Sequence, residues 1–154
     1  MLRLTQEADN ALRIMFLLAK SKERMDAPTL AGMAGIAPQF ALKILRKLKE
    51  GQLLCAVKGA HGGYFPAMPP EQISVLRIVE LIDGPLYLNR CLEKGFVCSR
   101  MGEKTGRCVV NRFFAEVNRS VAAQLSAVTL ADLLARDAMM SDPVPYEGEM
   151  PPCN

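Results

Sequence analysis

The sequence predicts a mainly α-helical fold with one small β-hairpin. Three features of the 154 residues, half of which are hydrophobic, support this prediction. Two short helical segments flank a glycine turn near residue 35, two short strands flank the glycine-rich stretch 59–63, and a long segment, 107–127, repeats apolar residues at helical spacing. A chain of this length forms one domain, or one domain with an extension.

The first three helices follow one another closely. Apolar residues recur at helical spacing over 6–20, which predicts the first helix. Pro28 and Pro38 stand in front of the next two, 29–33 and 39–49, and proline is well tolerated in the first turn of a helix. A tight glycine turn joins these two segments, so together they have the form of a helix-turn-helix.

The helix at 39–49 has one apolar face and one polar face. Its apolar residues are spaced i, i+3, i+4, i+7 and form a single stripe, which predicts burial of that side. The opposite face suits the major groove of DNA, because cations bind phosphates and Gln, Lys or Arg hydrogen-bond to base edges. We therefore predict DNA contacts from Gln39, Lys43, Arg46 and Lys47.

The β-hairpin that follows favours DNA binding over an ordinary surface helix. Its strands are predicted at 53–57 and 64–67, on either side of a glycine-rich tip that approaches a phosphate backbone easily. Lys58 and His61 flank the tip and are predicted to reach phosphates or a minor groove, although His61 fits an exposed loop residue without a role equally well. A helix, a helix-turn-helix and a hairpin in this order make a winged helix-turn-helix.

Charge supports a nucleic-acid partner for the first part of the chain. Residues 1–58 carry ten Lys and Arg against five Asp and Glu, whereas residues 59–154 carry nine against eleven. A basic excess of this kind suits a polyanion. The apolar run 14–19 is far shorter than the ~20 residues that span a membrane, and it lacks the features of a signal peptide, so we expect a cytoplasmic protein without membrane contact.

The second half contains a long loop and a long helix. A helix is predicted at 73–82, and the segment 91–108 after it holds three cysteines and no clear period. The helix at 107–127 is about 30 Å long with a continuous apolar stripe, which suits dimerisation; packing within its own chain is the alternative. We therefore divide the chain into a DNA-binding head, 1–68, a sensor loop with a dimerisation helix, 69–136, and a disordered tail, 137–154.

The candidate metal ligands are Cys91, Cys98 and Cys108. Five cysteines in a cytoplasmic chain argue against a disulfide framework and leave ligation, redox sensing or burial as their roles. Thiolates are soft ligands that suit iron–sulfur clusters and also zinc. Cys55 lies in a predicted strand, where we expect a small buried core residue, and Cys153 lies in the tail, where we expect no functional role.

Taken together, these segments resemble the Rrf-type winged-helix transcription regulators, which include IscR-like and NsrR-like iron–sulfur regulators. The resemblance covers almost all of residues 1–135 and is specific, because it combines the wing, a Gly-Pro after the helix at 73–82, and three cysteines. The matching segments are Arg3-Leu4-Thr5, Ala11-Leu12-Arg13, Val57 to Tyr64, Ile78-Val79-Glu80, Asp83-Gly84-Pro85, and Thr129 to Leu133.

The resemblance implies a homodimer that binds palindromic operator DNA and regulates transcription, with repression expected. In cluster-binding members of this family, three cysteines in the loop hold an iron–sulfur cluster, and gain or loss of the cluster alters DNA affinity. For this chain the resemblance implies a sensor of redox state, nitric oxide or iron–sulfur status. We expect a 4Fe–4S cluster, with 2Fe–2S as the alternative.

Three cysteines leave the fourth ligand open. IscR-like members place a His three residues after the last cysteine, where this chain has Asn111, and the one His of the chain is His61. In NsrR-like members an Asp from the other subunit completes the site, and the matching residue is Asp9. An aspartate is a hard ligand that leaves easily, which suits a labile sensor. Glu7 is the nearby rival, and Asp9 also fits an acid favoured in a first helical turn.

Two other functions fit parts of the sequence. A cluster-free regulator of the same fold, controlled by thiol oxidation or by a protein partner, needs only free cysteines in the loop. A small metal- or redox-active enzyme needs a catalytic acid, base or nucleophile in a pocket, but the chain has a single His and no carboxylate pair or nucleophile motif. We therefore do not expect an enzyme.

Overall fold

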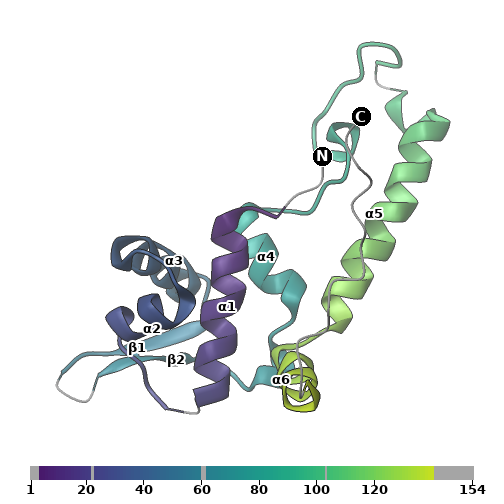
Figure 1. Ribbon diagram of the computed structural model, residues 1–154. Coiled ribbons are helices and arrows are strands. Elements are labelled where there is room, and N and C mark those ends of the chain that lie inside the picture. Colours follow the sequence, from purple (N-terminus) through teal and green to yellow (C-terminus); the bar gives the residue numbers. More distant parts are fainter. Residues whose placement is uncertain (1–3, 22, 60–61, 103, 141–154) are drawn as a thin grey trace, which may run out of the picture.

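The computed structural model describes residues 4–21, 23–59, 62–102 and 104–140, and it is mainly helical with one two-stranded antiparallel sheet (Figure 1). This confirms the predicted fold class. The elements in chain order are α1 (Gln6–Ser21), α2 (Ala27–Ala34), α3 (Pro38–Glu50), β1 (Leu54–Val57), β2 (Gly63–Pro66), the 3₁₀ segment η1 (Pro70–Gln72), α4 (Val75–Asp83), the 3₁₀ segments η2 (Arg90–Leu92) and η3 (Thr105–Arg107), α5 (Val109–Ala127) and α6 (Leu130–Met139).

Local sequence signals explain the helix-turn-helix. The carboxylate of Asp26 accepts a hydrogen bond from the backbone N–H of Thr29 at 2.8 Å, which caps the start of α2. Gly35 ends α2 with a φ of 66°, a left-handed conformation that glycine adopts at little cost. Pro38 then opens α3, so the predicted helices at 29–33 and 39–49 are confirmed in slightly longer form.

The hydrophobic core joins α1, α2 and α3 to α4 and α6. Its fully buried side chains each stabilise the fold by roughly 1.5–3 kcal/mol. The core contains residues on both sides of the predicted boundary between the head, 1–68, and the second part, 69–136. The division of the chain into these parts stays a prediction. The largest fully buried side chains are Ile14, Met15, Leu18, Leu30, Ile44, Leu45, Leu48, Leu53, Leu54, Ile73, Ile78 and Leu130.

The hairpin pairs Leu54 with Pro66 and Val57 with Gly63 in antiparallel register. Side chains alternate between the two faces of a strand, and here Leu54 occupies the core position. Its neighbour Cys55 consequently faces outward and is exposed. The prediction of a buried Cys55 is therefore wrong, because the core face of β1 falls on the residue before it.

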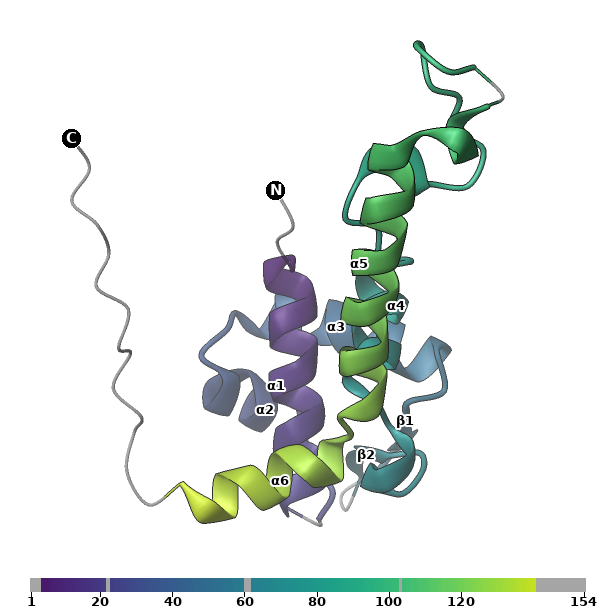
Figure 2. The same ribbon diagram turned by 90° about the vertical axis from the view of Figure 1, so that its right-hand side faces the viewer.

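At the other side of the molecule α5 reaches beyond the head, with the cysteine segment at one end and α6 at the other (Figures 1 and 2). We did not predict α6 as a helix. Its last turn contains residues 137–139, so the predicted disordered tail is wrong there; the tail beyond residue 140, including Cys153, lies outside the described residues. None of the helices in the described ranges is long and apolar enough to cross a membrane.

Candidate DNA-binding surface and cysteine segment

The outer face of α3 presents the polar residues that the sequence predicted. The rotation of the helix is fixed because Ala41, Ile44, Leu45 and Leu48 are all buried. Gln39, Lys43 and Arg46 are therefore exposed, and Lys47 lies on one flank of the helix, half-buried.

A groove of about 600 Å³ runs between the other flank of α3 and the hairpin. Arg46 and Lys49 line it from the helix, and Lys58 lines it from the end of β1. The structure therefore brings together two predicted cations and adds Lys49, which we missed because Lys49 lies on the flank of the helix and not at the centre of its outer face. The predicted contact His61 lies outside the described residues.

Gly62, next to β2, has no room for a side chain. A Cβ atom at this position would lie 2.3 Å from the carbonyl oxygen of Val57, which no side chain tolerates. The backbone N–H of Gly62 donates to the carbonyl of Gly59 at 2.9 Å and closes the turn. Close to the turn end of the hairpin, Met25 and Tyr64 exchange two backbone hydrogen bonds, which fixes β2 relative to the chain just before α2.

Glu7 of α1 contacts α3, the predicted DNA-recognition helix, directly. Its carboxylate lies 3.0 Å from Nζ of Lys43 and 2.8 Å from Nζ of Lys47, and its side chain is only 17% exposed. Burial alone would raise the pKa of Glu7, but hydrogen bonds from Lys47 and Lys43 outweigh it, and the pKa lies below its ordinary value of 4.5. The predicted rival ligand is thus held by two of the predicted DNA contacts.

Asp9 faces a different neighbour. Its carboxylate accepts a hydrogen bond from Nε of Arg13 at 2.8 Å, one helical turn later, and both side chains are exposed. This hydrogen bond is the main cause that raises the pKa of Arg13 above its ordinary value. Asp9 also lies at the edge of a shallow, mostly apolar pocket with Phe16, Met33 and Leu133.

The three predicted ligand cysteines are half-buried and carry free thiols. Cys91 lies in η2, and Asn111 of α5 donates a hydrogen bond from Nδ2 to its carbonyl at 2.9 Å and another to its Sγ at 3.3 Å. The backbone N–H of Cys98 donates to Oγ1 of Thr105 at 3.3 Å. Cys108 is the residue immediately before α5.

Within the part of the chain that the structure describes, no three His, Cys, Asp or Glu side chains gather closely enough to hold a metal ion. One chain alone therefore does not bring Cys91, Cys98, Cys108 and Asp9 into a finished ligand set. The cysteine segment nevertheless has a basic excess, with four cations against the two acids Glu93 and Glu103, which lowers the cost of gathering thiolates there. Its cations are Lys94, Arg100, Lys104 and Arg107.

A pair of hydrogen bonds ties the end of α4 to the start of α1. Asp83 is the last residue of α4, eight residues before Cys91, and its carboxylate accepts hydrogen bonds from the backbone N–H and the hydroxyl of Thr5. The same hydroxyl accepts from the backbone N–H of Ala8 and caps α1. The start of α1 therefore contacts the end of α4 through Thr5 and α3 through Glu7.

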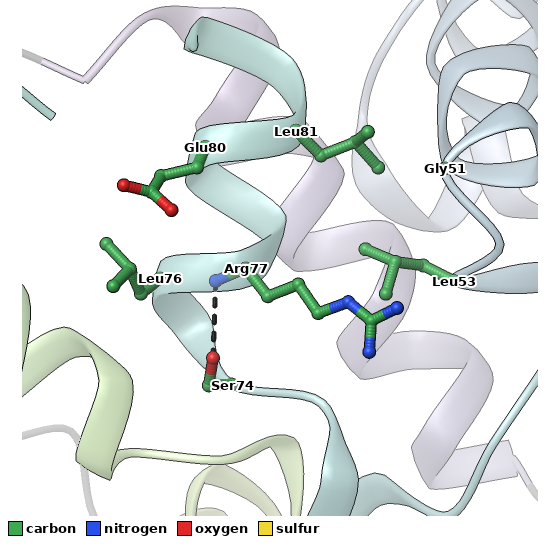
Figure 3. A pocket seen from close by; sticks show the side chains of 7 residues that line it. All are labelled: Gly51, Leu53, Ser74, Leu76, Arg77, Glu80 and Leu81. Atoms are coloured by element: carbon green, nitrogen blue, oxygen red, sulfur yellow. Dashed lines mark hydrogen bonds between the residues drawn. The ribbon is translucent and has the colours of Figure 1, made fainter. Parts of the chain in front are cut away.

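A further pocket lies between the end of α3 and α4, and its polar groups serve the fold (Figure 3). Ser74 accepts a hydrogen bond from the backbone N–H of Arg77 and so caps α4. The guanidinium of Arg77 donates to Sδ of Met68 at 3.3 Å. Gly51 and Leu81 form the opposite wall, so the pocket marks a packing seam between two helices.

Comparison with known proteins places the chain in a family. The family model Rrf2, described as an iron-dependent transcriptional regulator, matches residues 4–136. The chain belongs to the Rrf2 family. Its members are transcription regulators, so the alternative of a small enzyme is set aside, and the Rrf-type resemblance is confirmed.

Relatives and solved structures agree with this placement. A helix-turn-helix transcriptional regulator of Mycobacterium tuberculosis is 34% identical over 86% of this chain and 81% of its own length. An rrf2-like regulator of Rhodobacter capsulatus is 29% identical over 86% and 92%. T. potens IscR matches this chain in fold with a TM-score of 0.72 and 22% identity, covering 94% of this chain and 95% of its own. CymR, the global cysteine regulator of B. subtilis, matches with a TM-score of 0.70 and 22% identity over 88% and 98%.

Proposed function

We propose that this Rrf2-family regulator binds operator DNA as a homodimer and represses transcription according to redox state, nitric oxide or iron–sulfur status. The proposed sensor is an iron–sulfur cluster held by Cys91, Cys98 and Cys108. The observation that carries the proposal is the placement of three half-buried free thiols at one end of α5, in a segment that follows α4, whose last residue, Asp83, is hydrogen-bonded to Thr5 of the predicted DNA-binding head.

DNA binding follows from the exposed cations of the head. In the proposed complex, α3 enters a major groove and Gln39, Lys43 and Arg46 meet base edges and phosphates. The groove lined by Lys49 and Lys58 follows the phosphate backbone beside it. Two heads, one from each subunit, then contact half-sites about one turn of DNA apart.

Dimerisation follows from the uncovered apolar face of α5. All 19 residues of α5 are described and none is buried. Val109, Val110 and Phe113 are 78%, 53% and 58% exposed, which is unusual for a row of large apolar side chains on one helix. A second copy of α5 laid against this face would remove the row from water.

The donor set fits an iron–sulfur cluster. Three soft thiols in one short basic segment suit iron–sulfur ligation, and the family model describes iron-dependent regulators. A bound cluster, 4Fe–4S or alternatively 2Fe–2S, would supply a redox- and ligand-sensitive group whose ligands exchange. Cys91, Cys98 and Cys108 would hold it, Asn111 would keep its hydrogen bond near the Cys91 sulfur, and Asp9 of the partner subunit would complete the set.

The hydrogen bonds between Asp83 and Thr5 give this sensor a route to the DNA-binding head. A movement of the cysteine segment pulls on Asp83, and through Thr5 it shifts the first turn of α1. That turn carries Glu7, which holds Lys43 and Lys47. A change in the segment is thereby expected to change how α3 presents its cations.

Anaerobic purification with an iron and sulfide assay tests the proposal. We expect coloured protein with iron and acid-labile sulfide, and loss of both in Cys98→Ala. Cys55→Ala is the matched control, because Cys55 is an exposed thiol on the hairpin, away from the segment. Gel shifts of loaded and iron-free protein on a genomic promoter library then measure the coupling. Equal DNA affinity of the two forms, or colour retained in Cys98→Ala, contradicts the proposed sensor.

A cluster-free regulator controlled by thiol oxidation is the second candidate. It is favoured by the separation of the free thiols in one chain, and S. aureus CymR, a protein of similar fold, has been solved in an oxidized form. It predicts colourless, iron-free protein whose DNA affinity changes when peroxide joins two thiols in a disulfide, and returns when dithiothreitol reduces the disulfide again. Control through a protein partner predicts iron-free protein with neither response.

A further inference from the structure

Glu7 is placed where it opposes DNA binding. An acidic residue in the first turn of a helix commonly stabilises that helix by capping its N-terminus or by interacting with its dipole. The cap of α1, however, is supplied by the hydroxyl of Thr5, which accepts a hydrogen bond from the backbone N–H of Ala8. The carboxylate of Glu7 is turned instead to the neighbouring helix, where it meets Lys43 and Lys47 at 3.0 and 2.8 Å. Both lysines belong to the polar side of the recognition helix.

The exposed fractions of the Glu7, Lys43 and Lys47 side chains show which of the three groups a DNA strand can reach. The side chains of Lys43 and Lys47 are 57% and 36% exposed, whereas that of Glu7 is 17% exposed. A phosphate can therefore approach the two ammonium groups from outside while the carboxylate lies behind them. An ammonium has three donors, so it can bind a phosphate with or without leaving Glu7. In either case a fixed negative charge next to the ammonium partly cancels its attraction for the phosphate.

We propose that Glu7 is an internal competitor of DNA phosphate, which keeps the affinity of the recognition helix below the level its cations alone would reach. The inference rests on DNA binding through α3, as proposed above, and adds a residue that sets its strength. Because Glu7 lies two residues after Thr5, the same competition is open to adjustment from the cysteine segment through Asp83.

The test is the neutral isostere Glu7→Gln, whose DNA affinity is compared with that of the wild type in the full-length protein. The probe is a fluorescein-labelled, random-sequence duplex of about 30 base pairs, because phosphate contacts are independent of sequence and this length spans two half-sites. We expect about threefold tighter binding per head, so about tenfold for a dimer, from the loss of one partly covered ion-pair partner. Glu71→Gln is the matched control, since Glu71 is an exposed carboxylate in η1, which packs against α6.

A second pair of variants assigns the gain to the two lysines. In a Lys43→Gln, Lys47→Gln background, Glu7→Gln is expected to bring no further gain. Binding by Glu7→Gln that equals Glu71→Gln, or that is weaker than wild type, overturns the inference; weaker binding would mean that Glu7 positions the lysines for DNA. A gain that persists without the lysines also overturns it. If the wild type binds no duplex at any salt concentration, both this inference and the proposed function fail.

Discussion

Gly51 ends α3 where α4 passes close behind it. A Cβ atom on Gly51 would lie 2.3 and 2.4 Å from the two methyl carbons of Leu81, so Leu81 would have to move out of the seam (Figure 3). We predict that Gly51→Ala lowers the free energy of unfolding by roughly 1–3 kcal/mol, the usual cost of overpacking. Denaturant unfolding measures the difference.

The matched control is Gly32→Ala, in the interior of α2. A Cβ atom there meets nothing within 4 Å. The substitution should therefore stabilise the protein by roughly 0.5–1 kcal/mol, because alanine loses less conformational entropy than glycine in a helix. If Gly51→Ala proves as stable as Gly32→Ala, the seam between α3 and α4 is not tightly packed.

The capping carboxylates Asp26 and Asp132 make stability depend on pH. Hydrogen bonds from Thr29 hold the pKa of Asp26 below its ordinary value of 3.8, and hydrogen bonds from Thr129 do the same for Asp132. A carboxylate with a lowered folded-state pKa stabilises the fold above pH 3.8, and this contribution is lost as the pH falls through the lower folded value. We expect Asp132→Asn to be less stable than wild type at pH 7 and the difference to shrink below pH 3.8. A difference that is independent of pH, in thermal melts between pH 3 and 7, contradicts this assignment.

At the scale of elements, periodic patterns predicted some helices well and others not at all. Pro38 and Gly51 predicted the bounds of α3, and its stripe predicted the buried face, because four apolar residues at i, i+3, i+4, i+7 share one side of the helix. α6 was missed although its start is encoded in Thr129 and Asp132, which form a capping box. The apolar residues of α6 come soon after those of α5, so the spacing of apolar residues along the chain does not mark where one helix ends and the next begins. The capping box marks the start of α6 instead.

The exposed face of α5 leads to a prediction about assembly. We expect Phe113→Glu to weaken dimerisation by roughly 2 kcal/mol or more, because it buries a charge in the proposed interface. The monomer fold should survive, since Phe113 is 58% exposed in the single chain. Analytical ultracentrifugation measures the dissociation constant.

Ser126→Glu is the control for this variant. Ser126 is exposed near the end of the same helix, and at 100° per residue it lies outside the apolar stripe. The added charge should leave the dimer intact. A wild-type protein that is monomeric at micromolar concentration, or a Phe113→Glu variant that dimerises as tightly as Ser126→Glu, would show that this face of α5 is not the interface.

At the scale of the whole molecule, the site combines features that the sequence predicts with contacts that it does not. The cations of α3 follow from one helix and were predicted. The contacts of Glu7 with Lys43 and of Thr5 with Asp83 span 36 and 78 residues, and no local pattern encodes such pairs. The charge of Glu7 suggested a metal ligand because the sequence showed its neighbour Asp9 and not the helix that packs across from it.

These long-range contacts make α1 the element through which the proposed sensor would reach α3. Thr5, immediately before its first turn, is hydrogen-bonded to Asp83 at the end of α4, whereas its last turn contacts α6 through the ion pair of Lys20 with Asp137 at 2.8 Å. The two carboxylates thus hold opposite ends of one helix. If the state of the cysteine segment is transmitted through the first turn of α1, the contact of Asp83 transmits it and the contact of Asp137 does not.

Asp83→Ala and Asp137→Ala separate the two ends. Each removes an exposed carboxylate and its contact with α1, at a comparable cost of about 1 kcal/mol. We expect Asp83→Ala to reduce, by severalfold, the ratio of DNA affinities between the iron-loaded and iron-free forms, since such couplings span about 5- to 150-fold. Asp137→Ala should keep the wild-type ratio. Fluorescence anisotropy on one promoter fragment measures the six affinities, two for the wild type and two for each variant. A ratio that is unchanged in Asp83→Ala but reduced in Asp137→Ala would place the route at α6 instead.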